Sequence, residues 1–210
     1  MKTKGFTSEE EAAIRRPVWR DMLNILIFIG LVALGTLFIN TFLFRSFSVV
    51  GPSMESTLHT GDKLIVNRLA PTLARTFSGT YVPPRGQVIV FKNPIFVQTG
   101  TEEFIVKRVI GFTGERVTVK AGVVTVYNTD HPNGFNPDTP YLKSDGSGPV
   151  GPTSGDVDTT VPAGEIFVMG DHRVGSFSLD SRNGLGTIPL YDIIGPVALR
   201  FFPFTKISTF

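Results

Sequence analysis

Residues 22–44 form a run of 23 residues without a charged side chain, and this run limits the fold more than any other part of the sequence. As a helix it would be roughly 34 Å long, enough to cross a hydrocarbon core about 30 Å thick. The run ends at Thr41-Phe42-Leu43-Phe44-Arg45, without the small-residue cleavage site that follows the core of a secretory signal peptide. The sequence therefore predicts one retained transmembrane helix, and the alternative is a buried core helix.

The charges around this run predict its orientation. Only Arg45 follows the run closely, whereas five basic residues precede it: Lys2, Lys4, Arg15, Arg16 and Arg20. The positive-inside rule then places residues 1–21 in the cytoplasm and residues 45–210 outside it. Within the cytoplasmic segment, Ser8-Glu9-Glu10-Glu11 resembles a capping box and predicts a short helix over residues 9–16.

Composition excludes several functions. The 210 residues suit one soluble domain plus an anchor, and the net charge of +2 gives no general attraction for nucleic acid. The absence of cysteine rules out disulfides, thiol catalysis and cysteine-ligated metal. The sequence also lacks metal-ligand spacing and phosphate-binding glycine loops, so we expect neither a metal nor an organic cofactor.

After residue 45 the sequence is typical of a mainly β fold with an antiparallel β-sheet core and long loops. Short runs rich in Val, Ile, Phe and Thr predict strands, namely Lys63–Val66, Val88–Phe91, Phe104–Ile110, Val117–Lys120, Val123–Tyr127, Ile166–Met169 and Val197–Phe202. We find no convincing helical period in this part. Residues 128–163 are rich in Pro, Gly, Asp, Thr and Ser, which predicts an irregular insertion between core strands.

Phenylalanine is unusually frequent, with 18 residues, and it clusters in residues 91–96 and 201–204. An aromatic core is the first interpretation of these clusters. An exposed apolar rim that rests on lipid is the alternative.

Ser53 and Lys107 are the residues that point to catalysis. Ser53 stands in the turn sequence Gly51-Pro52-Ser53-Met54, close to the predicted membrane surface. Lys107 stands in the predicted strand 104–110, whose two faces are both mainly apolar. An ordinary lysine has a pKa of about 10.4, but burial can lower it by about 3–5 units. A neutral Lys107 would be a usable general base for a serine nucleophile.

A polar segment near the C-terminus offers partners for this strand. It contains Gly170-Asp171-His172-Arg173 and, further on, Ser178-Leu179-Asp180-Ser181-Arg182. Arg108 should point inward from the predicted strand, where it needs a carboxylate, and either Asp171 or Asp180 could supply one. A Ser-His-Asp triad built on His59, His131 or His172 is the competing arrangement.

Four blocks of this sequence resemble bacterial type I signal peptidases, a family with a Ser/Lys catalytic dyad. They follow the anchor in the family's order and comprise Val50–Leu58, Gly61–Asn67, Val106–Gly111, and Phe167–Arg173 with Ser178–Arg182. The resemblance implies that Ser53 is the nucleophile and Lys107 the general base. It also implies that Ser178 orients the lysine amine. The remaining residues that match the ion-pair scaffold are Asp171, Asp180, Arg108 and Arg182. The positions matching those that line shallow substrate pockets are Phe47, Val49, Leu58, Ile105 and Val106.

Two departures from the family pattern concern the site. Gly51 stands where some relatives carry a serine hydroxyl that completes the oxyanion hole, so only the Ser53 amide is assured as a donor. Four residues, 174–177, separate Arg173 from Ser178 where the common pattern has two.

Together these features predict a membrane-anchored serine endopeptidase that removes signal peptides from exported preproteins at the bacterial inner membrane. Its expected partners are preproteins, the lipid bilayer and a protein translocase. Two alternatives remain at this stage. One is a Ser/Lys self-cleaving repressor peptidase, against which the anchor and the charge argue. The other is a noncatalytic β-rich interaction module on a membrane stalk.

Overall fold

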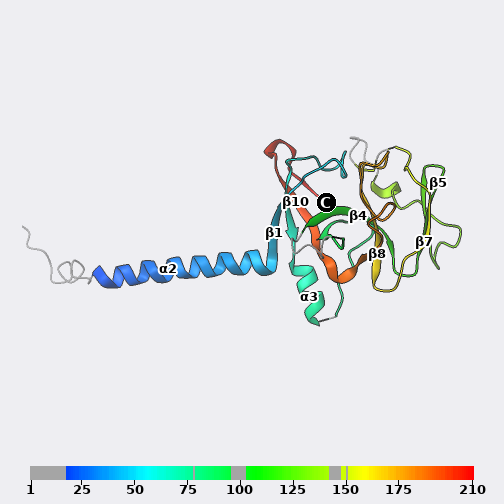
Figure 1. The fold of residues 1–210 in the computed structure, drawn as a ribbon. Coiled ribbons are helices and arrows are strands. Elements are labelled where there is room, and N and C mark those ends of the chain that lie inside the picture. The colour runs from blue at the N-terminus through cyan, green and yellow to red at the C-terminus, as the bar shows by residue number, and fades with distance from the viewer. Residues whose placement is uncertain (1–17, 78, 96–102, 142–147, 150) are drawn as a thin grey trace, which may run out of the picture. The chain divides into compact units, whose positions relative to one another are not determined.

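The computed structural model describes residues 18–77, 79–95, 103–141, 148–149 and 151–210. The chain divides into two units, residues 1–41 and residues 42–210 (Figure 1). The helix predicted over residues 9–16, and most of the predicted cytoplasmic segment, lie outside the described residues.

Helix α2 (Val18–Phe38) forms the described part of the first unit, and the π-helical segment η1 (Ile39–Leu43) continues it. No residue of α2 is buried within the chain, although most of its side chains are apolar. The helical stretch Val18–Leu43 is long and apolar enough to cross a membrane. The core helix of a soluble protein is covered by the rest of its chain, whereas the apolar side chains of α2 are not covered.

The second unit is built on antiparallel strands, as the sequence predicts. The larger sheet has the order β1-β2-β10-β3-β4-β8-β9, and β11 also pairs with β10. Its strands are β1 (Phe44–Ser48), β2 (Lys63–Asn67), β3 (Val88–Lys92), β4 (Phe104–Phe112), β8 (Glu165–Met169), β9 (Ile188–Pro189), β10 (Ile193–Phe202) and β11 (Ser208–Thr209). A smaller sheet has the order β6-β5-β7, with β5 (Arg116–Lys120), β6 (Val123–Tyr127) and β7 (Val157–Thr160).

All seven predicted strands are present, with differences of a few residues at their ends. The structure adds β1, β7, β9 and β11. Strand β1 begins at the last residue of the apolar run and contains Arg45, Ser46 and Ser48, so its composition does not predict a strand. Strand β7 lies inside residues 128–163, which we predicted to be irregular. Its burial alternates and it pairs with β5, so tertiary pairing forms a strand where composition does not indicate one.

The prediction of no helix after the anchor is wrong, because residues Leu69–Phe77 form helix α3. Pro71 makes this stretch read as a loop, but proline is tolerated in the first turn, where backbone N–H groups have no partner within the helix. The Asn67 Oδ1 accepts a hydrogen bond from the Leu69 N–H at 2.9 Å and so caps the helix. Several elements are too short to be recognised from the sequence. They are β9, β11 and the 3₁₀ turns η3 (Thr139–Tyr141), η4 (Leu190–Asp192) and η5 (Phe204–Lys206).

Strand β3 shows how the core supports the site. Its alternate residues pack into two different apolar clusters, Val88 and Val90 into one, and Ile89 and Phe91 into the other. Strand β4 lies between β3 and β8, so it is central, as the apolar faces of residues 104–110 predict. A polar side chain on β4 is therefore held away from bulk water.

Strand β10 pairs with β2 through its second half and with β3 through its first half. Its register shifts at Gly195, where a Cβ atom would lie 2.1 Å from the Asn67 carbonyl oxygen. Only glycine allows this close approach. The irregularity lets one strand join the two parts of the sheet.

The phenylalanine clusters divide between the two interpretations. Phe91 is fully buried, in agreement with an aromatic core, whereas Phe202 and Phe204 are exposed near the C-terminus. Phe96 lies outside the described residues.

Candidate active site

The segment that follows β1 places Ser53 at the surface of the apolar core. The Val49 N–H donates to the Asp62 carbonyl at 2.8 Å, and the Gly61 N–H donates to the Val49 carbonyl at 3.0 Å, so the segment closes on itself. Met54, next to Ser53, is fully buried. The turn thus fixes the backbone on both sides of the serine while leaving its side chain partly accessible.

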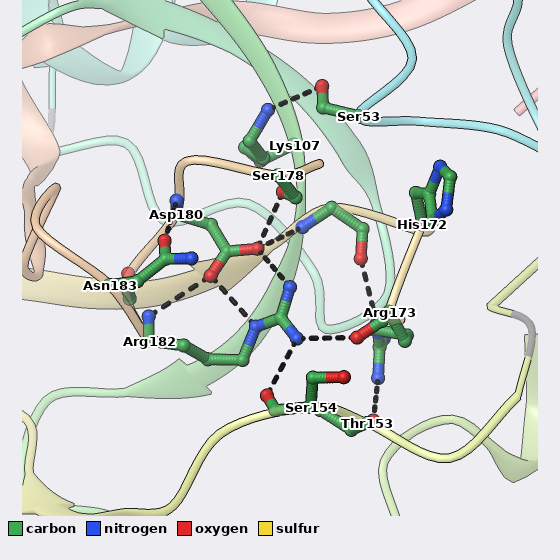
Figure 2. Close-up of polar contacts among 12 residues, drawn as sticks. Ser53, Lys107, Thr153, Ser154, His172, Arg173, Ser178, Asp180, Arg182 and Asn183 are labelled. Atoms are coloured by element: carbon green, nitrogen blue, oxygen red, sulfur yellow. Dashed lines mark hydrogen bonds and ion pairs between the residues drawn. The ribbon is translucent and has the colours of Figure 1, made fainter. Parts of the chain in front are cut away.

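Lys107 extends from the middle of β4 toward this serine. Its Nζ lies 2.8 Å from the Ser53 Oγ and 3.0 Å from the Val106 carbonyl oxygen (Figure 2). The lysine is only 3% exposed. Two side chains separated by 54 positions in the sequence are therefore within hydrogen-bonding distance at the edge of the core.

Burial changes the chemistry of this lysine. Loss of hydration lowers the pKa of Lys107 from 10.5 to about 8, and this effect outweighs the negative charges of Asp180 and Asp171, which raise the pKa. The positive charge of Arg182 adds a smaller lowering effect. With a pKa of about 8, roughly a tenth of the molecules carry a neutral amine at pH 7, against well under 0.1% for an ordinary lysine. A neutral amine can accept a proton from a serine hydroxyl.

Arg108 points to the opposite face of β4 and pairs with Asp171. The Arg108 Nε donates to Asp171 Oδ1 at 2.8 Å and its Nη2 donates to Asp171 Oδ2 at 2.5 Å. Both residues are buried, and the Thr57 hydroxyl also donates to Asp171. The sequence left Asp171 and Asp180 open as partners of Arg108, and in the structure the partner is Asp171.

Asp180 is the centre of a second buried network, which Figure 2 shows beside the dyad. Its Oδ2 accepts hydrogen bonds from the Gly170 N–H at 2.9 Å, the Ser178 hydroxyl at 2.7 Å and Arg182 Nη2 at 2.8 Å. Burial alone raises the pKa of Asp180, but the hydrogen bonds and charge of Arg182 outweigh it and the pKa falls below its ordinary value. The carboxylate stays charged and ties together the segment that follows β8, near enough to Lys107 to raise the pKa of the lysine.

Ser178 lies near the lysine, but its hydroxyl donates to Asp180. Within the described residues, the hydrogen bonds of the Lys107 amine go to Ser53 and to the Val106 carbonyl. In this structure Ser178 therefore acts on the carboxylate network, and the lysine-orienting role that the resemblance implies is not seen as a direct bond.

Sequence reasoning gave no role to Arg173, which is almost fully buried. Its Nη1 and Nη2 donate to the two carboxylate oxygens of Asp138 at 2.5 and 2.6 Å, and its Nε donates to the Gly170 carbonyl at 2.8 Å. This pair ties the insertion to the residue just before Asp171. Asp138 lies in a segment without periodicity, so no sequence signal could have matched it to Arg173.

A groove of about 510 Å³ opens over the dyad. Four of the five predicted pocket residues line it, namely Phe47, Val49, Ile105 and Val106. The fifth, Leu58, is fully buried in the core cluster and is not among the residues that line this groove. Phe177 and Leu179, which the sequence analysis did not single out, also line the groove.

Gly51 lies where a second oxyanion donor would be expected. Its φ of +95° is a left-handed conformation that an L-residue adopts only with strain. Its own N–H donates to the Thr60 hydroxyl at 3.0 Å. The Gly51 N–H is therefore engaged within the turn.

The histidines give no support to a Ser-His-Asp triad. His172 approaches the Ser53 segment, but its Nδ1 contacts the Pro52 carbonyl oxygen at 3.2 Å rather than the Ser53 hydroxyl. Since that carbonyl can only accept, the contact requires a proton on Nδ1. Among the described residues, no group of three or more His, Asp or Glu is placed to hold a metal ion.

An antiparallel β domain that holds a serine hydroxyl against a buried lysine amine has the arrangement expected of a serine peptidase. The family described as signal peptidase, peptidase S26, matches residues 19–202, and the chain belongs to this family.

Two curated signal peptidases are similar to this chain over most of its length. The signal peptidase I T of Bacillus subtilis (strain 168) is 33% identical over 188 residues, which cover 85% of this chain and 84% of that protein. A signal peptidase I of Bacillus caldolyticus is 32% identical over 210 residues, which cover 96% of this chain and 98% of that protein. Among solved structures, a signal peptidase I from Enterococcus faecalis V583 is 25% identical, with a TM-score of 0.41, and covers 56% of this chain and 97% of its own.

Proposed function

We propose that this chain is a membrane-anchored serine endopeptidase that removes signal peptides from exported preproteins, with Ser53 as the nucleophile and Lys107 as the general base. The observation that carries the dyad is the 2.8 Å separation between the Lys107 Nζ and the Ser53 Oγ, at a lysine that is buried and has a lowered pKa. Membership of the signal peptidase family supports the substrate class.

In the proposed reaction, the neutral Lys107 amine accepts the proton of Ser53 while the serine oxygen attacks the scissile carbonyl carbon. The Ser53 N–H donates to the developing oxyanion. The lysine ammonium then protonates the leaving amine, and the acyl-enzyme forms. A water molecule deprotonated by Lys107 hydrolyses the ester and restores the enzyme.

The ion pairs support this chemistry without touching the substrate. Arg108 neutralises the charge of Asp171 in the core, and Arg182 neutralises that of Asp180. If either carboxylate lost its arginine, its charge would act on the lysine more strongly and raise the pKa of the base. Ser178 belongs to the same support through its bond to Asp180.

The groove fits an extended peptide with small side chains before the cut. Phe47, Val49, Ile105 and Val106 form its apolar walls. Strand β1 lies at the edge of the larger sheet, and Ser48 at its end also lines the groove. A preprotein segment could therefore hydrogen-bond to exposed backbone beside Ser53 in the manner of an added strand.

The proposed arrangement in the cell follows the apolar helix and the charges. Residues 1–21 lie in the cytoplasm, residues 22–44 cross the inner membrane once, and residues 45–210 form the extracytoplasmic peptidase domain, with residues 128–163 as an insertion. The bilayer presents the preprotein and the enzyme on the same surface. Association with a protein translocase is part of the same proposal.

Incubation of the detergent-solubilised full chain with a preprotein tests the function. We expect one cleavage after the signal peptide, abolished by Ser53→Ala and by Lys107→Ala. Equal cleavage by both variants and the unmodified chain would contradict the dyad. Absence of any cleavage by a folded chain would favour the noncatalytic interaction module instead.

A further inference from the structure

The segment that follows Arg173 presents two apolar side chains to solvent. Phe177 is 59% exposed and Leu179 is 46% exposed, whereas Ser178 between them is fully buried. This alternation turns both apolar residues away from the Asp180 network, and both line the groove that contains Ser53. The ring of Phe177 keeps more than half of its surface accessible on a groove wall, where a bound peptide would cover it.

His172 connects Phe177 to the segment that carries the nucleophile. The two rings stack with their centroids 4.7 Å apart and their planes inclined by 25°. The His172 N–H donates to the Ser53 carbonyl oxygen at 3.1 Å, and its ring contacts the Pro52 carbonyl. Figure 2 shows His172 beside the Ser53 segment. The position of the phenylalanine is therefore coupled to the backbone of the catalytic serine.

We infer that Phe177, with Leu179 beside it, contacts a bulky apolar side chain of the preprotein close to the scissile bond and so determines which preproteins are cut efficiently. The inference rests on the proposed function and adds to it a preference for substrates with a bulky apolar side chain at this place. The pocket residues on β1 and β4 accept small side chains, whereas this wall offers a broad aromatic surface. His172 acts as a positioning residue, because its ring holds Phe177 in place and does not line the groove.

A peptide panel tests this contact with the full chain in detergent. The peptides span a signal-peptide cleavage region and carry leucine or serine at each position flanking the cleaved bond in turn. We expect Phe177→Ala to lower kcat/KM about tenfold for leucine at one or two adjacent positions, mainly through KM, and to leave the serine peptides unchanged. His172→Asn should give a smaller loss at the same positions.

Phe77 on α3 is an even more exposed phenylalanine, at 81%, and it lies outside the groove, so Phe77→Ala is the control for loss of an exposed ring. It should show no dependence on peptide position. A uniform loss of kcat for all peptides with Phe177→Ala would mean that the ring only shields the dyad from water, and would overturn the inference. Unchanged kinetics for every peptide would overturn it as well. Failure of the unmodified chain to cut any peptide would overturn the proposed function together with it.

Discussion

Replacement of Lys107 by methionine should abolish activity and, at neutral pH, make the protein more stable. Methionine has a similar unbranched shape without the charge. A decrease of the lysine pKa from 10.5 to about 8 means that the fold disfavours the ammonium by about 3 kcal/mol, at 1.36 kcal/mol per pKa unit. Loss of the hydrogen bond to Ser53 offsets about 1 kcal/mol of this gain. We therefore expect a net increase of about 2 kcal/mol in the free energy of unfolding at pH 7.

The pH dependence of this difference has a definite sign. Because the pKa of Lys107 is lower in the folded state than in the unfolded state, the unfolded chain binds more protons between pH 8 and 10.5, and the stability of the unmodified protein rises with pH. The destabilisation is complete below pH 8 and disappears above 10.5. Between pH 7 and 9, the advantage of Lys107→Met should shrink by about 1 kcal/mol.

Denaturant titration of the full chain in detergent, followed by circular dichroism at several pH values, measures this difference. Other ionisable groups are common to both proteins and cancel in the comparison. Lys63, an exposed lysine on β2, provides the control variant Lys63→Met, for which no such gain is expected. A Lys107→Met variant that is less stable at pH 7, or whose advantage does not change between pH 7 and 9, would refute the reasoning.

Three further predictions concern the same site. Gly170→Ala should reduce the rate of cleavage by at least about 100-fold. The reason is that a Cβ atom there would lie 2.2 Å from the Ser178 Oγ and 2.3 Å from the Ser53 carbonyl oxygen. A normal rate would contradict this packing. Arg108→Ala leaves Asp171 buried without its arginine, so it should lower the free energy of unfolding by about 3–5 kcal/mol. Denaturant titration measures this change, and a loss under about 1 kcal/mol would show that the pair is not buried. The rate kcat/KM should fall about tenfold per pH unit below the base pKa of about 8 and level off above it, and a rate independent of pH from 6 to 9 would exclude an amine base.

Much of the site could be predicted from local sequence because its central residues lie on a strand with a strict period. Alternation along residues 104–110 places Lys107 and Arg108 on opposite faces, and two apolar faces imply a buried strand. The structure confirms both points. The choice between Asp171 and Asp180 was not available from the sequence, because it depends on the register in which Met169 on β8 pairs with Arg108.

Other features depend on contacts that no local pattern encodes. Leu58 follows the turn that carries Ser53, and the direction of its side chain depends on how that turn folds back. In the structure Leu58 packs into the core. Asp138 and Arg173 are 35 positions apart in the sequence, and neither lies in a helix or strand. Helix α3 was missed because a proline in its first turn suppresses the helical signal. Short elements and buried pairs between distant loops are set by tertiary packing, which the sequence does not show directly.

The protonation state of Lys107 is the central claim, and a titration of its side chain tests it most directly. Nuclear magnetic resonance of the lysine ε-carbons in the Ser53→Ala variant, compared with Lys107→Met to assign the signal, would follow this one amine. We predict a midpoint near pH 8, well below the pKa of about 10.4 of an ordinary lysine. A midpoint above pH 10 would contradict the account, because the amine would then be almost fully charged at the pH at which it must accept a proton.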